Sequence, residues 1–255
     1  MLGALMLGGC FAGSSGGAVD PRSNAIYDVA RDSFGKGQLR EALGKVDEAL
    51  DIDSANADAA YLGSLILLDF CAKDAESSDC RLEQAEKYAR RAIHANEDMR
   101  DAKNALGVIL IHEKRYDDAI AVLKPLAEDI IYGSPEKSWG NLGWAYLEKG
   151  NAPQAVEALR RAVAAQPNFC VGNFRLGVAY EKLGDLMAAQ GALTRALSTN
   201  RPGCDRLQDA FDARARISLK EGKREEARGD LQKCRDIAVS SPVGLRCEAA
   251  MRSLQ

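Results

Sequence analysis

The fold of this 255-residue chain is decided by one stretch, SWGNLGWAYLEKGNAPQAVEALRRAVAAQPN, residues 138–168. Large, small and helix-ending residues occupy set positions in it, namely Trp139, Leu142, Gly143, Tyr146, Ala155, Leu159, Ala162 and Pro167. Much of this set returns 34 residues further on, as Leu176, Gly177, Tyr180, Ala189, Leu193 and Ala196. Self-similarity at a fixed period indicates structural units that stack side by side.

These residues and spacings resemble the tetratricopeptide repeat (TPR), in which each unit is a pair of antiparallel helices. The glycine and alanine positions let the two helices approach closely, and the large residues fill the space between successive units. Pro167 ends the second helix, where its missing N–H costs no hydrogen bond. The resemblance implies an all-α fold, a TPR solenoid that winds into a right-handed superhelix.

Weaker copies of the pattern extend in both directions, and their markers are Ala42, Val46, Leu62, Gly63, Leu106, Gly107, Phe211 and Ala227. They predict six repeats, over residues 23–56, 57–99, 100–135, 136–169, 170–207 and 208–241. Residues 242–255 are expected to form a capping helix, which covers the last apolar face of the solenoid.

The N-terminal residues 1–10, MLGALMLGGC, resemble the end of a bacterial lipoprotein signal peptide. In that family the cysteine of the lipobox is lipidated, which predicts Cys10 as the lipid attachment site. Residues 1–9 are then a truncated signal peptide, and the Gly- and Ser-rich residues 10–22 a flexible tether. Phe11, which is not acidic, favours the periplasmic face of the outer membrane by the same resemblance. The alternative is a disordered tail with a chance cysteine.

Six further cysteines favour disulfide bonds over a metal site. The chain has no C-x2-C pair and only two histidines, so zinc ligation is not expected. Disulfides indicate an oxidising compartment. The positions of these cysteines in the repeats favour three bonds between consecutive cysteines. A buried free thiol remains an alternative for Cys234. The favoured bonds are Cys71–Cys80, Cys170–Cys204 and Cys234–Cys247.

The inner face of the first helix of each repeat is the candidate binding groove, because TPR proteins bind extended segments or partner helices there. The projected face looks apolar and centres on Trp144 and Phe174, which favours an anchoring pocket for a protein partner. The alternative is that both rings pack between repeats. The Lys, Arg and Asn clamp of chaperone-binding TPR domains is not recognised. The full projected set is Asn104, Val108, Ile111, His112, Lys137, Gly140, Trp144, Leu147, Val171, Phe174 and Val178.

No motif predicts catalysis, a cofactor or a small-molecule substrate. The net charge of −3 and the lack of a long basic run argue against a nucleic-acid partner. Acidic pairs such as Asp117-Asp118 fall at expected helix starts, where they favour the positive end of the helix dipole. We therefore expect a non-enzymatic scaffold for a protein partner. An enzyme with cryptic residues on the solenoid is the least supported alternative.

A lipobox, a short tether and six TPRs together resemble the type IV pilus pilotins, the PilF/PilW/Tgl family. The resemblance implies an outer-membrane lipoprotein that helps the pilus secretin subunit to insert and oligomerise. The six extra cysteines depart from the PilF/PilW pattern and fit a Tgl-like protein better. The alternative is a TPR lipoprotein adaptor that recruits peptidoglycan enzymes or serves outer-membrane protein assembly.

Overall fold

The computed structural model describes residues 18–74, 76–199, 204 and 207–254. Thirteen helices and no strand occur in this described part of the chain, which confirms the predicted all-α class. The helices are α1 (Pro21–Gly35), α2 (Leu39–Ile52), α3 (Ala57–Lys73), α4 (Leu82–Ala95), α5 (Arg100–His112), α6 (Tyr116–Glu128), α7 (Pro135–Glu148), α8 (Ala152–Ala165), α9 (Cys170–Leu183), α10 (Leu186–Ser198), α11 (Gln208–Lys220), α12 (Arg224–Ile237) and α13 (Pro242–Arg252).

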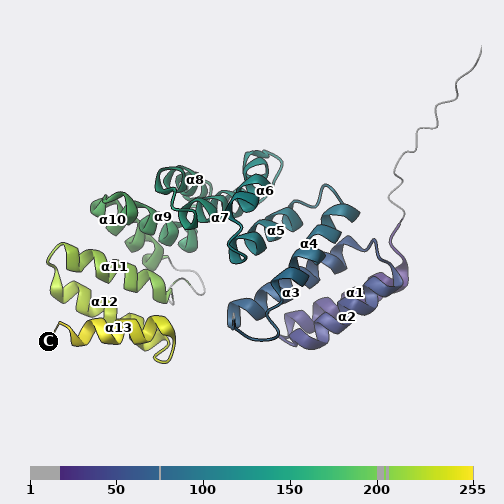
Figure 1. The fold of residues 1–255 in the computed structure, drawn as a ribbon, viewed down its shortest axis with the longest axis horizontal. Helices are drawn as coiled ribbons and strands as arrows, with labels where there is room; N and C mark the ends of the chain where they lie inside the picture. The colour runs from purple at the N-terminus through teal and green to yellow at the C-terminus, as the bar shows by residue number, and fades with distance from the viewer. Residues whose placement is uncertain (1–17, 75, 200–203, 205–206, 255) are drawn as a thin grey trace, which may run out of the picture.

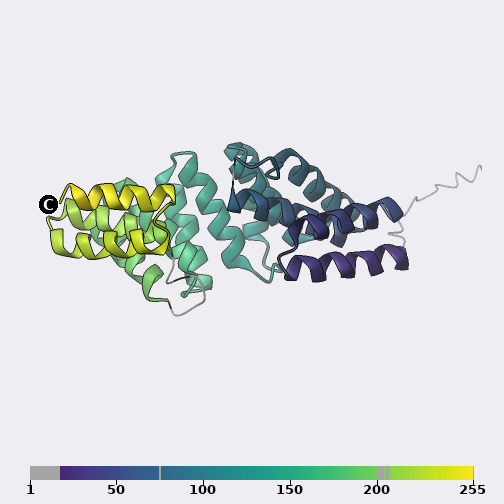
Figure 2. The same cartoon turned by 90° about the horizontal axis from the view of Figure 1, so that it is seen from below.

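The helices pack in sequence order as pairs and form an arc (Figure 1). In the middle of the molecule α6, α8 and α10 lie on the outer side of the arc, and α5, α7 and α9 lie on its inner side (Figure 1). A view from below shows the same one-dimensional stacking, with α1 and α13 at opposite ends (Figure 2). The architecture is the solenoid that the repeat pattern predicts, with α13 as the expected cap.

Close helix approach within a repeat depends on the glycine of the Leu-Gly pair. A Cβ added at Gly143 in α7 would lie 2.5 Å from Cγ of Leu159 in α8, and one at Gly177 in α9 would lie 2.5 Å from Cγ of Leu193 in α10. Both leucines are fully buried. Any larger residue would therefore push the two helices of the pair apart.

The apolar core follows the solenoid rather than a single centre. One cluster of buried residues joins α1 to α8, and smaller clusters continue through α13. The largest fully buried side chains come from both helices of the pairs, and they include Val46, Ile66, Leu67, Ile109, Leu110, Leu123, Leu142, Leu159, Leu176, Leu193, Ile217 and Leu231. Each repeat therefore depends mainly on its neighbours for burial.

Three disulfides join the six cysteines in the sequential pairs that repeat position favours. Cys71 and Cys80 close the loop between α3 and α4, with their Cα atoms 4.4 Å apart. The other two bonds tie later elements together. Cys170–Cys204 links α9 to the segment before α11, and Cys234–Cys247 holds the cap α13 on α12.

The start of the solenoid requires one correction. Residues 21–22 were expected in the tether, but α1 already begins at Pro21. The side chain of Asp20 accepts the backbone N–H of Arg22, and proline suits the first turn because its missing N–H needs no partner there. Cys10, the predicted lipid attachment site, lies outside the described residues. Within the described ranges, no helix is long and apolar enough to cross a membrane.

Candidate functional site

The centre of the inner face is a stack of Arg175 on Trp144. Arg175 belongs to α9, and its guanidinium carbon lies 4.2 Å from the centre of the Trp144 ring in α7. The same guanidinium donates from Nη1 to Oδ1 of Asn141 at 3.1 Å and to the backbone oxygen of Gly140 at 3.4 Å. One side chain thus joins the aromatic and polar parts of two neighbouring repeats.

A polar chain continues from this stack into the preceding repeat. Asn141 donates from Nδ2 to Oδ1 of Asn104 in α5, at 3.1 Å. Three consecutive inner helices therefore contribute one residue each to a connected row. The row runs in one direction, from the donor Arg175 through Asn141 to the acceptor Asn104.

Both ends of this row present hydrogen-bond donors. Among the described residues, no hydrogen bond is formed by Nε or Nη2 of Arg175, or by the amide nitrogen of Asn104. A guanidinium has five N–H donors and no acceptor, and an asparagine amide has two. The row is therefore suited to a ligand that supplies acceptor oxygens.

Arg175 has no carboxylate partner within 4.0 Å in the part of the chain that the structure describes. Burial disfavours its charged form and lowers the pKa of Arg175 to about 10, which still leaves it cationic at neutral pH. The carboxylate of Glu148 raises that pKa only partly towards its ordinary value, and it accepts the indole N–H of Trp144 at 3.2 Å. Among the described residues, the inner face therefore carries a half-buried positive charge without an ion pair.

His112, at the end of α5, extends the aromatic surface of the stack. Its ring meets the edge of Trp144 at a centroid distance of 5.2 Å and an angle of 82°. Partial burial and the positive charge of Arg175 both lower the pKa of His112. The imidazole is therefore neutral at physiological pH and adds no second positive charge to the site.

Several residues projected onto the groove do reach the surface. Lys137 is exposed, and Asn104, Val108 and Trp144 are partly exposed. Trp144 also packs against the core cluster of the first four repeats, so it is both a groove residue and a packing residue. Both interpretations of Trp144, as a groove residue and as a residue that packs between repeats, therefore describe it.

Other projected residues do not line a groove. Ile111 and Leu147 are only 3% and 6% exposed, because they pack into the core between helices. Gly140 is covered by the ring of Phe169, whose Cε1 lies 2.7 Å from an added Cβ. These three assignments were wrong, since the rotation of each helix turns these positions towards its neighbour.

For Phe174 the structure supports the alternative interpretation, packing between repeats. Phe174 and Val178 are partly buried and pack against the cluster that joins the fifth and sixth repeats. Val171 is partly exposed and is not among the residues that contact Arg175, Asn141 or Trp144 in the described structure. The centre of the inner face is consequently polar and cationic, built on Arg175 and Asn141.

Arg175 and Asn141 were missed by the projection, although the sequence carries a signal for them. Each directly precedes the Leu-Gly pair of its repeat, and the two are 34 residues apart. Tyr61 holds the same place before Leu62-Gly63, and Ala105 before Leu106-Gly107. The residue at this position varies while the Leu-Gly pair does not, and in the fourth and fifth repeats it supplies the two side chains that meet on the inner face.

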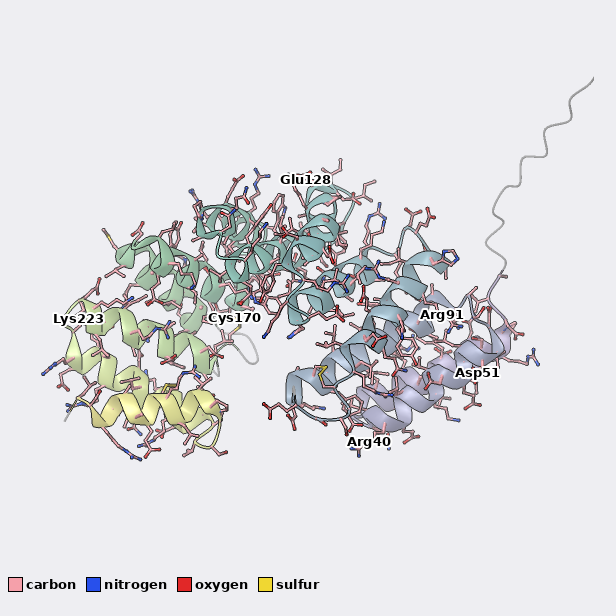
Figure 3. All side chains as sticks on the ribbon, viewed as in Figure 1. Arg40, Asp51, Arg91, Glu128, Cys170 and Lys223 are labelled. Carbon is pink, nitrogen blue, oxygen red and sulfur yellow. A yellow bond between two sulfur atoms is a disulfide. The ribbon has the colours of Figure 1, made fainter. Side chains whose placement is uncertain are left out.

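A second arginine–tryptophan stack lies between α6, α7 and α8 and has a different character. The guanidinium carbon of Arg161 is 4.6 Å from the ring centre of Trp139. Arg161 is exposed and pairs with Glu157 at 3.0 Å. In Figure 3 the labelled Glu128, at the end of α6, lies on the outer side of the arc, whereas Cys170, at the start of α9, lies on the inner side. Glu128 lines one pocket with Trp139 and Arg161, so the Arg161 stack lies towards the outer side and is a matched control for that of Arg175.

Comparison with known proteins now identifies the repeat. Residues 81–130 and 136–169 match two family models, each described as a tetratricopeptide repeat. These two stretches of the chain are TPR repeats. A curated relative, the TPR repeat-containing protein PA0015 of Pseudomonas aeruginosa, is 40% identical over 58 residues. That match covers 23% of this chain and 55% of the relative, so the chain spans only about half of that relative's length.

Solved structures share the fold over almost the whole solenoid. PilW, described as a widely conserved type IV pilus biogenesis factor, superposes with a TM-score of 0.73 at 19% identity and covers 89% of this chain and 98% of its own. PilF of Pseudomonas aeruginosa gives a TM-score of 0.69 at 17% identity, over 89% and 97% of the two chains. At these identities the likeness establishes the TPR fold.

The arrangement presents hydrogen-bond donors and aromatic rings that suit binding. Its donors belong to one guanidinium and one amide, and its aromatic rings are held by packing. In the described ranges, no group of three or more His, Cys, Asp or Glu side chains is placed to hold a metal ion. TPR solenoids use their concave surfaces for protein partners, and this inner face has the stack at its middle.

Proposed function

We propose that this TPR protein is a non-enzymatic scaffold of type IV pilus biogenesis, a lipoprotein pilotin that assists outer-membrane insertion and oligomerisation of the pilus secretin. The observation that carries the proposal is the extent of the shared fold. PilW and PilF are covered over 98% and 97% of their lengths, so the shared fold extends over almost all of each protein.

The inner face supports the protein-binding part of the proposal. Trp144 and Arg175 combine a large planar surface with an unpaired charge, and residues of these two types are enriched among those that dominate binding energy at interfaces. They lie on the middle repeats, where a bound segment can contact helices on both sides. A secretin segment is the partner that we propose.

The cellular location is part of the same proposal. We propose that Cys10 is lipidated and anchors the chain to the outer membrane, with the solenoid in the periplasm. The three disulfides support an oxidising compartment, since such bonds are rare in a reducing cytosol. Labelling with a radioactive fatty acid tests this part, because Cys10→Ser should abolish the label.

Deletion of the gene in the bacterium that carries it tests the main proposal. We expect the heat-resistant multimers of the secretin to be lost from membrane fractions, as seen by immunoblotting, and to return when the intact gene is restored. Cys10→Ser should restore them poorly, because the chain would no longer reach the outer membrane.

The alternative adaptor role gives a different result. If the multimers persist after deletion while cell shape or outer-membrane protein levels change, the pilotin proposal is wrong. The scaffold then serves peptidoglycan enzymes or outer-membrane protein assembly. Persistence of the multimers without any such change also contradicts the pilotin proposal.

A further inference from the structure

We infer that this chain forms a two-fold dimer in which Ile130 and Ile131 of each copy fill a groove between α4 and α6 of the other copy. These two residues lie in the turn between α6 and α7 and are here called the isoleucine tip. The groove, here called the α4–α6 groove, is lined by residues of α4, α5 and α6. The inference goes beyond the proposed function, because neither the pilotin nor the adaptor role requires a second copy.

The isoleucine tip is exposed to solvent and yet fixed in place. Ile130 is 99% exposed and Ile131 is 74% exposed. Oδ1 of Asp129 accepts the N–H of Ile131 at 2.9 Å, and Oδ2 of the same carboxylate accepts from Nε of Arg100 at 2.6 Å. Directly after the tip, the buried Tyr132 donates its hydroxyl to a carboxylate of α5 at 2.8 Å. A turn held in this way loses little conformational entropy when a partner covers it.

The α4–α6 groove lies beside the isoleucine tip. In the described structure α4 and α6 both pack on α5 but not on each other, and a space of about 580 Å³ is lined by all three helices. The apolar part of its lining is formed by Ile93, Leu106, Val122 and Pro125. Pro125 belongs to the last turn of α6, and α6 ends shortly before the tip. Tip and groove are therefore neighbours on the same chain.

The equivalent groove of the next repeat is filled by the chain itself. Among α6, α7 and α8 the ring of Trp139 stacks with Arg161, and a space of only about 190 Å³ remains there. The step of 36 residues that relates Leu106-Gly107 to Leu142-Gly143 places Lys103 and Pro125 at the two corresponding positions of the third repeat. Neither residue supplies an aromatic ring. The α4–α6 groove therefore has room for a large apolar group from outside the chain.

Charge at the two features favours a second copy as the occupant. Arg90 in the lining of the groove already pairs with Glu86 at 2.6 Å, whereas Lys103 forms no ion pair among the described residues. Glu128, at the end of α6 next to the tip, is exposed and likewise has no ion pair in the described chain (Figure 3). Exchange of the tips brings these two opposite charges together. Glu97, also in the lining, opposes Glu128 and limits the strength of the association.

The adjacency of tip and groove suits a two-fold contact. A two-fold axis between them places each tip in the groove of the other copy, so that both tips and both grooves are used and none remains for a third copy. Two contacts of this size cover less area than a permanent dimer needs. We therefore expect a dimer with a dissociation constant in the micromolar range, which separates on dilution.

Sedimentation velocity of the full chain, from micromolar to submillimolar concentration, tests the inference. We expect the double variant Ile130→Ser/Ile131→Ser to weaken the dimer by roughly a hundredfold or more, since each change occurs twice in a two-fold dimer. Lys103→Trp, which copies the filled groove of the fourth repeat, should weaken it likewise. Met187→Ser, at an exposed apolar residue of α10, is the matched control and should leave the dimer unchanged.

Mixing the two weakened variants gives a second and more specific test. The tip variant keeps its groove and Lys103→Trp keeps its tip, so a mixed pair retains one of the two contacts while neither variant retains any with itself. In NMR spectra of the isotopically labelled tip variant, the signals of Leu106 and Val122 should shift when unlabelled Lys103→Trp chain is added. They should stay in place when unlabelled tip variant is added. Circular dichroism checks that both variants are folded.

Three results would overturn the inference. The wild type is monomeric over the whole concentration range, as expected if the tip enters a membrane or another protein instead. The dimer forms but survives either the tip or the groove variant. The mixed variants show no shift of the Leu106 and Val122 signals. Because the dimer is measured on the isolated chain, loss or persistence of secretin multimers in the deletion strain tests the proposed function separately.

Discussion

At the scale of single residues, Arg175 determines the character of the inner face. It occupies a position that is tyrosine in the second repeat, alanine in the third and asparagine in the fourth. Its side chain covers Trp144 and reaches the backbone of Gly140, so it also fastens α9 to α7. A change here would alter binding and inter-repeat contact together, so a thermal unfolding measurement should accompany any Arg175 variant.

The pKa of His112 provides a residue-scale prediction. Burial lowers it first and the charge of Arg175 lowers it further, so Arg175→Met should raise the pKa of His112 partway towards its ordinary value. NMR titration of the imidazole protons measures this. Arg161→Met should leave the His112 titration unchanged. An unchanged pKa in Arg175→Met would show that Arg175 does not act on His112.

The sign of the associated stability effect follows from linkage. Because the folded pKa of His112 is lower than that of the unfolded chain, the unfolded state binds the proton first as the pH falls below about 6.5. His112 therefore lowers stability at acidic pH and has no such effect above that pH. His112→Gln should reduce the fall in unfolding free energy between neutral pH and about pH 5.5.

At the scale of the helix pair, glycine positions divide into two kinds. Gly143 faces Leu159, whose buried side chain leaves no room for a Cβ, whereas no atom lies within 4 Å of a Cβ added at Gly229 in α12. The first glycine permits packing. The second only makes its helix more flexible, because it has no packing role in the structure.

Alanine at these two glycines should consequently act in opposite directions. We expect Gly143→Ala to lower the free energy of unfolding by about 1–3 kcal/mol through overpacking against Leu159. Gly229→Ala should raise it by about 0.5–1 kcal/mol, since alanine favours the helix and restricts the unfolded chain. Urea denaturation measures both. Destabilisation by both variants to the same extent would contradict the assigned packing role.

At the scale of the whole molecule, charged contacts bridge neighbouring repeats. Glu181 in α9 accepts hydrogen bonds from Arg216 and Lys220 in α11, at 2.9 and 2.8 Å. Glu86 in α4 pairs in the same way with Arg115, just before α6, at 2.7 Å. In a solenoid such interfaces matter because each repeat contacts only its neighbours.

The stability of the solenoid should fall in acid for this reason. Burial alone would raise the pKa of Glu181, but Arg216 and Lys220 outweigh it and the net pKa is below the ordinary value of 4.5. Because the pKa of Glu181 is lower in the folded chain than in the unfolded chain, its ionised carboxylate stabilises the fold above the unfolded pKa. This contribution is lost as the pH falls through the folded pKa. Urea denaturation should show Glu181→Gln to be destabilised at neutral pH and less sensitive to acid. Glu157→Gln, at an exposed pair, should differ little from the wild type. Equal acid sensitivity of Glu181→Gln and wild type would contradict this role.

How far the candidate site could be predicted differs from one residue to the next. Trp144 was predicted on the groove because it falls in the projected face of its helix, one turn after Gly140. Ile111 and Leu147 were projected there by the same periodicity, yet they are buried. Periodicity assigns a residue to a side of its own helix but does not determine how far the next repeat covers that side.

The sequence by itself determined the all-α class, the repeat and its phase, because small and large residues recur at a period that only stacked helix pairs satisfy. It also favoured the three disulfide pairs that the structure forms. Only the tertiary structure decided what lies at the centre of the inner face. Arg175, Asn141 and Asn104 come from three separate repeats, and the rotation between successive helix pairs sets which of their side chains meet. That rotation is the sum of packing contacts along the whole solenoid, so no local pattern within one repeat contains it.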